Sequence, residues 1–207
     1  ENLSIAYEQG LTVATNALLE GKAAKVGLLT TEGHRDVIEM REGLKPERYN
    51  LRMAPPDPLV PRRLRLGVRE RMRPDGTVEI ALDRASLDAA IEILGQADVA
   101  AVSICFLHAF TNPAHEQRAR DLLGAEAPEI TVSVSSEVSP MYPEFERAST
   151  TVLNAYVGTA VNAYIGRLEA ELARLATGAP FRTADLRTAL ATVHGGDADA
   201  GGAAGCA

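Results

Sequence analysis

The sequence has few aromatic residues and no tryptophan. Aromatic residues make up 4% of the 207 residues, whereas hydrophobic residues as a whole make up 46%. A chain of this length can bury roughly 70% of the surface that it exposes when unfolded. The core is therefore expected to consist mainly of Ala, Val, Leu and Ile side chains, as in an ordinary globular domain.

The chain also lacks basic charge and long apolar runs. Its net charge is −7 at pH 7, whereas nucleic-acid binding needs a basic field. No run reaches 18 apolar residues, and no basic segment followed by an apolar one opens the chain. We expect no nucleic-acid partner and no membrane span. The arginines within residues 62–73 are interpreted as a solvated strand face, with an anion or partner site as the alternative.

Cysteine is scarce, with Cys105 in an apolar run and Cys206 in a Gly/Ala-rich stretch. We interpret Cys105 as a buried free thiol and expect no disulfide framework, which favours a cytoplasmic location. Cys105, His108 and His115 have the spacing C-x2-H-x6-H, but a zinc site usually brings four ligands and no fourth is evident. No metal site is predicted. The role of the three residues is left open, except that His115 is expected to interact with the cap of its own helix.

Recognisable catalytic loops are absent as well: there is no G-x-S-x-G elbow, Walker loop or G-x-G-x-x-G fingerprint. What is present is an alternation of β and α patterns over residues 1–140. We predict helices at 12–20, 35–40, 86–96 and 113–123, strands at 25–30, 99–106 and 130–135, and a β-hairpin at 63–82 that turns at Asp75-Gly76. Leu87, Ala90, Ile91 and Leu94 are expected to form the apolar face of the helix at 86–96. Together the elements predict an α/β domain with a mixed sheet.

Beyond residue 140 the pattern changes. Apolar residues recur at three- and four-residue steps over 141–177, which predicts a long amphipathic helix, broken or bent at Gly158. Residues 178–207 contain Gly-rich stretches without periodicity, so we expect an irregular or disordered tail.

Six short segments occur in a characteristic order. They are TVATNALLE at 12–20, VGLLTTEG at 26–33, RDVIE at 35–39, NPAHE at 112–116, SSEV at 135–138, and ER with STTVLNAYVG between 146 and 158. Together they resemble the N-terminal region of the hydantoinase A, 5-oxoprolinase and acetone carboxylase family. The connector LKPERYNL at 44–51 is more similar to the ketone carboxylase branch, which includes acetone and acetophenone carboxylases.

The resemblance implies a mixed sheet of the actin-like ATPase (ribonuclease H-like) type, with ATP and Mg²⁺ as cofactors. It implies hydrolase or carboxylase chemistry, in which an amide or ketone oxygen is phosphorylated. It further implies a cyclic amide or ketone substrate, a partner of the hydantoinase B type in a hetero-oligomer, and a cytoplasmic location. Neither the substrate nor the choice between hydrolysis and carboxylation follows from the sequence.

Three segments depart from the family pattern. The family's D-x-G-G-T-x-T-D phosphate loop is missing, and Glu8 or Gln9 with Gly10, Leu11 and Thr12 stand where the family has H-G-T-T. Residues 181–207 do not resemble the family's continuation. We therefore expect a chain truncated at both ends that is inactive alone, the alternative being a non-catalytic partner-binding module.

No catalytic residue is identified, but the matching segments supply candidate nucleotide or substrate contacts: Gly10, Thr12, Thr15, Asn16, Glu146, Arg147 and Asn154. The helix predicted at 12–20 begins after the turn at Gly10, and the free backbone N–H groups of a helix N-terminus can bind phosphate. The alternative is that Thr12 only caps the helix. Glu146 and Arg147 are first interpreted as structural, with Arg147 paired to the acidic residues of its own first turn, and a role in holding a substrate or a neighbouring subunit is the alternative. Asn154 either bonds into the core or faces a cleft.

Overall fold

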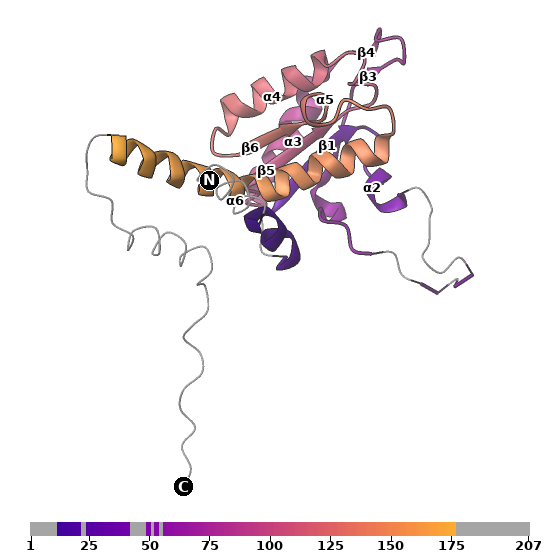
Figure 1. The fold of residues 1–207 in the computed structure, drawn as a ribbon. Helices are drawn as coiled ribbons and strands as arrows, with labels where there is room; N and C mark the ends of the chain where they lie inside the picture. The colour runs from indigo at the N-terminus through magenta and orange to yellow at the C-terminus, as the bar shows by residue number, and fades with distance from the viewer. Residues whose placement is uncertain (1–11, 22–23, 42–48, 51, 54–55, 177–207) are drawn as a thin grey trace. The chain divides into compact units, whose positions relative to one another are not determined.

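The computed structural model describes residues 12–21, 24–41, 49–50, 52–53 and 56–176 (Figure 1). Gly10, Cys206 and the predicted tail at 178–207 lie outside these residues. The chain divides into two compact units, one of residues 17–159 and one of residues 1–16 and 160–207. The larger unit contains the sheets. The boundary predicted at residue 140 is a different division and stays a prediction.

A four-stranded parallel sheet forms the centre of the larger unit. Its order is β2-β1-β5-β6, with β1 at Val26–Thr31, β2 at Arg65–Val68, β5 at Ala101–Cys105 and β6 at Thr131–Val134. Every residue of β1 and β5 is buried, as expected for central strands covered on both faces. The predicted α/β class is confirmed.

The predicted hairpin at 63–82 is wrong in its first half. Residues 65–68 pair in parallel with β1 instead of turning back on themselves. The antiparallel pair is shorter and forms its own sheet, with β3 at Arg71–Met72 and β4 at Val78–Ile80. The turn at Asp75-Gly76 is correct, because Gly76 has a φ of 82° and Asp75 Oδ1 accepts the backbone N–H of Thr77 at 2.9 Å.

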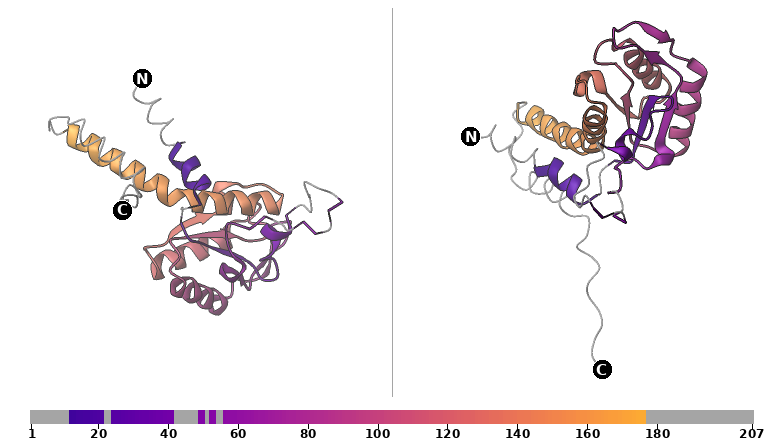
Figure 2. Two further views of the ribbon diagram at one scale, coloured as in Figure 1. Left: turned by 90° about the horizontal axis from the view of Figure 1, so that it is seen from below. Right: turned by 90° about the vertical axis from the view of Figure 1, so that its right-hand side faces the viewer.

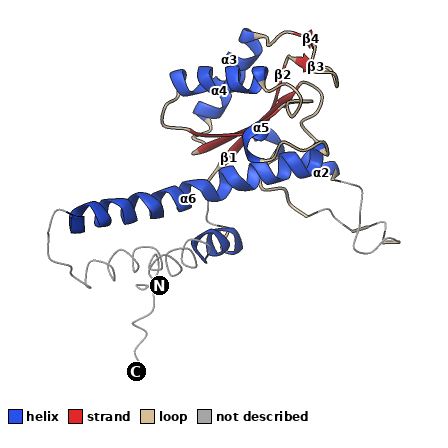
Figure 3. Ribbon diagram, turned by 45° about the horizontal axis from the view of Figure 1, so that its top comes forward, coloured by secondary structure: helices blue, strands red, loops and turns tan. Residues whose placement is uncertain are grey.

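Helices cover both faces of the parallel sheet. Helices α3 (Arg84–Gln96) and α4 (Ala114–Glu126) cover one face, and the first half of α6 (Glu144–Ala176) covers the other (Figures 1 and 3). Further views show the same layers (Figure 2). The short elements are α2 (Val37–Met40), the 3-10 turn η1 (Arg62–Leu64) and α5 (Ser135–Val138).

Helix α3 forms as its sequence predicts. Asp83 is the N-cap, and its side chain accepts the backbone N–H of Ser86 at 2.9 Å. The buried face consists of the four predicted apolar residues, Leu87, Ala90, Ile91 and Leu94. This face packs on the sheet close to Gly27, where an added β-carbon would overlap the side chain of Leu94.

Residues 12–19 are helical, and Gly21 follows them with a φ of 63°, as expected for a glycine at a helix end. Helix α6 continues through Gly158 as a single helix. Among the described residues, none of the helices combines the length and the apolar character that a membrane span needs.

The arginine-rich stretch is not uniformly solvated, because Arg65 is only 1% exposed. Its guanidinium donates to the Val60 carbonyl at 2.9 Å and forms ion pairs with Glu39 at 2.7 Å and Asp36 at 3.4 Å. Burial is tolerated here because the charge is compensated by two carboxylates and a carbonyl. Arg63 is exposed, as expected.

Candidate functional site

Polar side chains gather where β1, β5 and β6 end. In a sheet of parallel strands the carboxyl ends meet at one edge, which is where open α/β sheets bind ligands. Thr31 is the last residue of β1, the segment from Phe106 follows β5, and Ser135 follows β6. This edge is therefore the candidate site.

The first group at this edge is a hydrogen-bonded chain of three side chains, Thr31, Glu70 and His115. Thr31 Oγ1 donates to the carboxylate of Glu70 and accepts the backbone N–H of Leu107 at 2.9 Å. Glu70 Oε2 lies 2.8 Å from His115 Nδ1, and the two side chains are 0% and 11% exposed. His115 thus pairs with a carboxylate from the segment between β2 and β3, and not with the cap of its helix as predicted.

This chain of contacts sets the chemistry of the imidazole. Because a carboxylate accepts only, the proton of a neutral His115 ring is placed on Nδ1. Nε2 is then the proton-accepting nitrogen. A histidine held in this way by a carboxylate can transfer a proton to or from a group that reaches Nε2.

Glu116, the next residue, connects two segments at the same edge. Its Oε1 accepts from the backbone N–H of Phe106 at 2.8 Å and from Ser135 Oγ at 2.6 Å, and its Oε2 accepts the backbone N–H of Ser136 at 2.9 Å. Burial raises the pKa of Glu116, although these hydrogen bonds act to lower it. One carboxylate thereby fixes both the turn after β5 and the turn after β6.

Arg147, in the first turn of α6, is as buried as Arg65, at 1% exposed. Its Nη2 donates to the Phe106 carbonyl at 2.8 Å, and its guanidinium lies 5.4 Å from the centre of the Phe110 ring. Nε and Nη1 are buried and have no hydrogen-bond partner among the described residues. The predicted pairing with the acidic first turn of α6 is wrong, since the described part of the chain offers this guanidinium no ion pair.

Cys105 is a buried free thiol, as predicted. Burial raises the pKa of Cys105 to about 11, and the nearby Arg147 charge acts in the opposite direction without offsetting it. The thiol is therefore protonated at neutral pH and is a poor nucleophile. In the described part of the chain, no three His, Cys, Asp or Glu side chains are placed to hold a metal ion.

The sequence-derived candidates fall into separate places. Thr12, Thr15 and Asn16 belong to the smaller unit, whereas Glu146, Arg147 and Asn154 lie on α6 within the larger one. Asn154 donates to Ser133 Oγ on β6 at 3.0 Å and so ties the helix to the sheet. Glu146 is half-buried. Of the candidates on α6, Arg147 alone reaches the segment that follows β5.

Sequence reasoning missed Thr31 and Glu70 entirely. Both belong to the candidate site only because a contact joins Glu70 to His115, which is 45 residues away. The one local signal was the adjacent pair His115 and Glu116 in the NPAHE segment. That segment was used only for the family resemblance, and His115 was expected to interact with the cap of its helix.

A pocket of about 250 Å³ lies elsewhere in the larger unit. Its lining residues come from α2, the connector and the start of α6: Ile38, Arg41, Pro56, Asp57, Pro58, Leu59, Phe145, Ser149 and Val152. The lining shares no residue with the polar groups described above.

Comparison with known proteins gives a consistent answer. The family model of the hydantoinase/oxoprolinase N-terminal region matches residues 7–127. The chain is 42% identical to the caprolactamase subunit alpha of Pseudomonas jessenii, over 84% of this chain and 25% of the relative. It is 34% identical to the acetophenone carboxylase gamma subunit of Aromatoleum aromaticum, over 91% of this chain and 26% of the relative.

Solved structures that match this chain are of the same kinds of protein as its sequence relatives. The crystal structure of the ATP-dependent caprolactamase from Pseudomonas jessenii matches with a TM-score of 0.73, over 79% of this chain and 24% of that one. A nucleotide-free acetone carboxylase matches with a TM-score of 0.63 at 31% identity, over 72% of this chain and 22% of that one. The chain spans about a quarter of the length of these relatives. It therefore belongs to the hydantoinase/oxoprolinase family.

Proposed function

We propose that this chain is part of an ATP-dependent subunit that activates an amide or ketone oxygen by phosphorylation. The observation that supports this most is the likeness to two solved structures, an ATP-dependent caprolactamase and an enzyme of ATP-dependent acetone carboxylation. One name refers to a cyclic amide and the other to a ketone. Phosphorylation of a lactam oxygen opens its carbonyl to water, and phosphorylation of an enolised ketone prepares a carbon nucleophile for CO2. Both reactions need the same first step.

The residues at hand do not by themselves fit a Mg²⁺–ATP site. The sequence contains no D-x-G-G-T-x-T-D segment, and among the described residues no three His, Cys, Asp or Glu side chains are grouped so as to hold a metal ion. The proposal is therefore that this chain alone does not turn over substrate. Arg147 would add a contact to a nucleotide or substrate site completed by other parts of a longer subunit. Thr12, Thr15 and Asn16, which belong to the other unit, are separate candidates for such contacts.

The relatives are named as subunits alpha and gamma of their enzymes. By analogy, a second subunit of the hydantoinase B type and a cytoplasmic location complete the proposal. A non-catalytic partner-binding module is the competing function, and the experiments below separate the two.

The first experiment is a thermal unfolding scan of the purified chain with and without Mg²⁺–ATP. A ligand that binds only the folded state stabilises it by about 2.7 kcal/mol at a hundredfold excess over its dissociation constant. We expect an unchanged midpoint. A midpoint raised by ATP would mean that the chain forms a nucleotide site unaided, which would contradict its proposed inactivity alone.

The second experiment tests the activity itself. The matching segment of the caprolactamase subunit alpha is replaced by this chain, and substrate-stimulated ATP hydrolysis is measured with a panel of lactams and ketones. We expect stimulation by at least one of the two classes. A chimera that folds and assembles like the parent, yet shows no stimulation by either class, would favour the non-catalytic module.

A further inference from the structure

We propose that Arg147 is the centre of a binding site for the oxyanion of a small molecule, a carboxylate or a phosphate. The proposal starts from a contrast between the two buried arginines. Arg65 and Arg147 are equally buried, at 1% exposed each. Arg65 is compensated by Glu39, Asp36 and a carbonyl. Arg147 has no carboxylate partner among the described residues, and its neighbours are the Phe106 carbonyl and the Cys105 thiol.

The incomplete pairing of Arg147 is energetically costly. A guanidinium removed from water without a counter-charge loses its hydration and gains no ion pair in return. Nε and Nη1 both lie buried without an acceptor among the described residues. An oxyanion is the ligand that guanidinium N–H groups bind best.

The neighbouring groups do not supply the missing negative charge. Cys105 is protonated at neutral pH, as described above. The two oxygens of Glu116 accept from Phe106, Ser135 and Ser136, and among the described residues this carboxylate forms no ion pair with Arg147. The unpaired N–H groups of Arg147 are therefore available to a ligand.

The sheet face below this part of α6 carries small polar side chains. Ser103 and Ser133 are opposite each other in the register of β5 and β6, and their side chains point to the same face because paired residues do so. The bond from Asn154 to Ser133 identifies that face as the one under α6. Cys105, two residues after Ser103, shares it.

Further unpaired polar atoms lie on β5, on the segment after it and on α5. Ser103 Oγ on β5, His108 Nδ1 after β5 and Ser136 Oγ on α5 are all buried without a hydrogen-bond partner in the described part. Buried polar atoms are nearly always paired in folded proteins. Ser103 and His108 belong to the same strand and turn as Cys105 and Phe106, the neighbours of Arg147. Unpaired atoms on these segments are what an unfilled polar site predicts, whereas a purely structural core would pair them.

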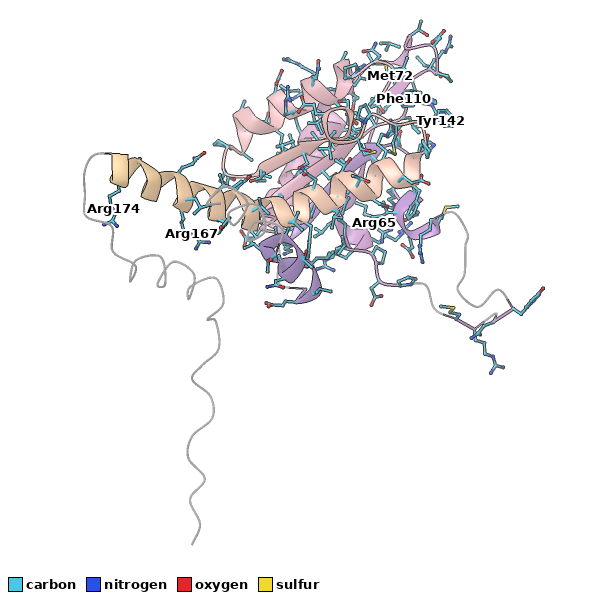
Figure 4. The ribbon with its side chains drawn as sticks, viewed as in Figure 1. Arg65, Met72, Phe110, Tyr142, Arg167 and Arg174 are labelled. Atoms are coloured by element: carbon cyan, nitrogen blue, oxygen red, sulfur yellow. The ribbon has the colours of Figure 1, made fainter. Side chains whose placement is uncertain are left out.

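Aromatic side chains cover the guanidinium. The half-buried Phe110 ring lies over Arg147 and packs edge-on against Tyr142, with ring centres 5.8 Å apart. Tyr142 is 75% exposed, and both rings lie at the end of the sheet near the β3–β4 hairpin (Figure 4). In this proposal Phe110 and Tyr142 move aside to admit the ligand and then exclude water from the ion pair.

The inference rests on the proposed function in one respect, namely that Arg147 is among the candidate substrate or nucleotide contacts. The experiment uses the whole chain with arginine side chains labelled with ¹⁵N, so that the Nε–H signal of Arg147 reports binding directly. Sodium phosphate and sodium acetate are titrated separately, with sodium chloride at equal ionic strength as the reference. The Arg147→Met variant assigns the signal, and Arg63→Met, an exposed arginine with the same charge change, is the control.

We expect a saturable shift of the Arg147 signal with acetate, with phosphate or with both, and no shift with chloride. A response to acetate alone identifies a carboxylate ligand, and a response to phosphate alone identifies a phosphate. Tyr142→Ala should speed the exchange between free and bound forms in the same spectra, which keeps the test independent of whether Arg147→Met folds. Absence of a saturable shift with either oxyanion would overturn the proposal and leave trapped water as the partner. That outcome would not alter the Mg²⁺–ATP or chimera results, so the two proposals fail separately.

Discussion

Replacement of Glu116 by glutamine tests whether one buried carboxylate holds the edge of the sheet together. The side chain is 0% exposed and accepts three hydrogen bonds. Glutamine retains one acceptor oxygen, which can keep the Phe106 and Ser135 bonds, but its amide group then faces the backbone N–H of Ser136. The Ser136 N–H then has no acceptor, and a buried donor left unsatisfied costs about 1–3 kcal/mol. We expect Glu116→Gln to lower the free energy of unfolding by about that amount.

The dependence on pH gives the prediction a second check. Burial raises the pKa of Glu116 above its ordinary value of 4.5. An acid whose folded-state pKa is raised contributes stability that is complete below the unfolded value and is lost as the pH rises through the folded value. Glutamine does not titrate, so the stability gap between wild type and variant should be widest near pH 4.5 and narrow as the pH increases from there.

The assay is urea unfolding followed by far-ultraviolet circular dichroism across this pH range. Glu129→Gln, at an exposed position, is the matched control and should lie within about 0.5 kcal/mol of wild type. Equal stability of wild type and Glu116→Gln, or a gap that widens with rising pH, would refute the reasoning.

Three further predictions follow from other contacts. Thr31→Val removes a hydroxyl that donates to Glu70 and accepts from Leu107, and should lower the free energy of unfolding in urea titrations by about 1–3 kcal/mol. A loss smaller than the experimental error of the titration would count against the hydrogen-bonded chain. Gly27→Ala places a methyl group against Leu94 and should lower the free energy of unfolding by about 1–3 kcal/mol. Gly124→Ala, in open space on a helix, should raise it by up to about 1 kcal/mol. A stabilised Gly27→Ala or a destabilised Gly124→Ala in thermal scans would contradict the packing of α3 on the sheet. Cys105, whose pKa is about 11, should react with a thiol reagent at pH 8 only after unfolding; rapid reaction of the folded chain at this residue, identified by peptide mapping, would contradict its burial.

Periodicity predicts much of the fold, because the apolar residues that repeat with the period of a helix are the ones that the helix buries. Leu87, Ala90, Ile91 and Leu94 were assigned to one face of a helix, and all four are buried. The prediction of the hairpin was wrong in its first half because periodicity carries less information for a strand than for a helix. Alternation specifies which side of a strand is apolar but not which strand is its neighbour, so residues 65–68 were placed with β4 when they pair with β1.

The candidate site was less accessible to sequence reasoning. His115 was visible as part of a motif, but its partner Glu70 comes from a different supersecondary unit, and nothing in the local pattern pairs them. Arg147 was predicted as a candidate contact, but the partners predicted for its side chain were wrong. Adjacent acidic residues on a helix are natural partners for an arginine, whereas in the fold the side chain extends toward the end of β5.

The bonds of Glu116 have a consequence for the motions of the chain. The same carboxylate accepts the amide of Phe106 and the amide of Ser136, two positions far apart in sequence. Release of the carboxylate frees both amides in a single opening. Their hydrogen-exchange rates should therefore fall and rise together under every condition, so that the turns after β5 and β6 behave as one cooperative unit of local unfolding.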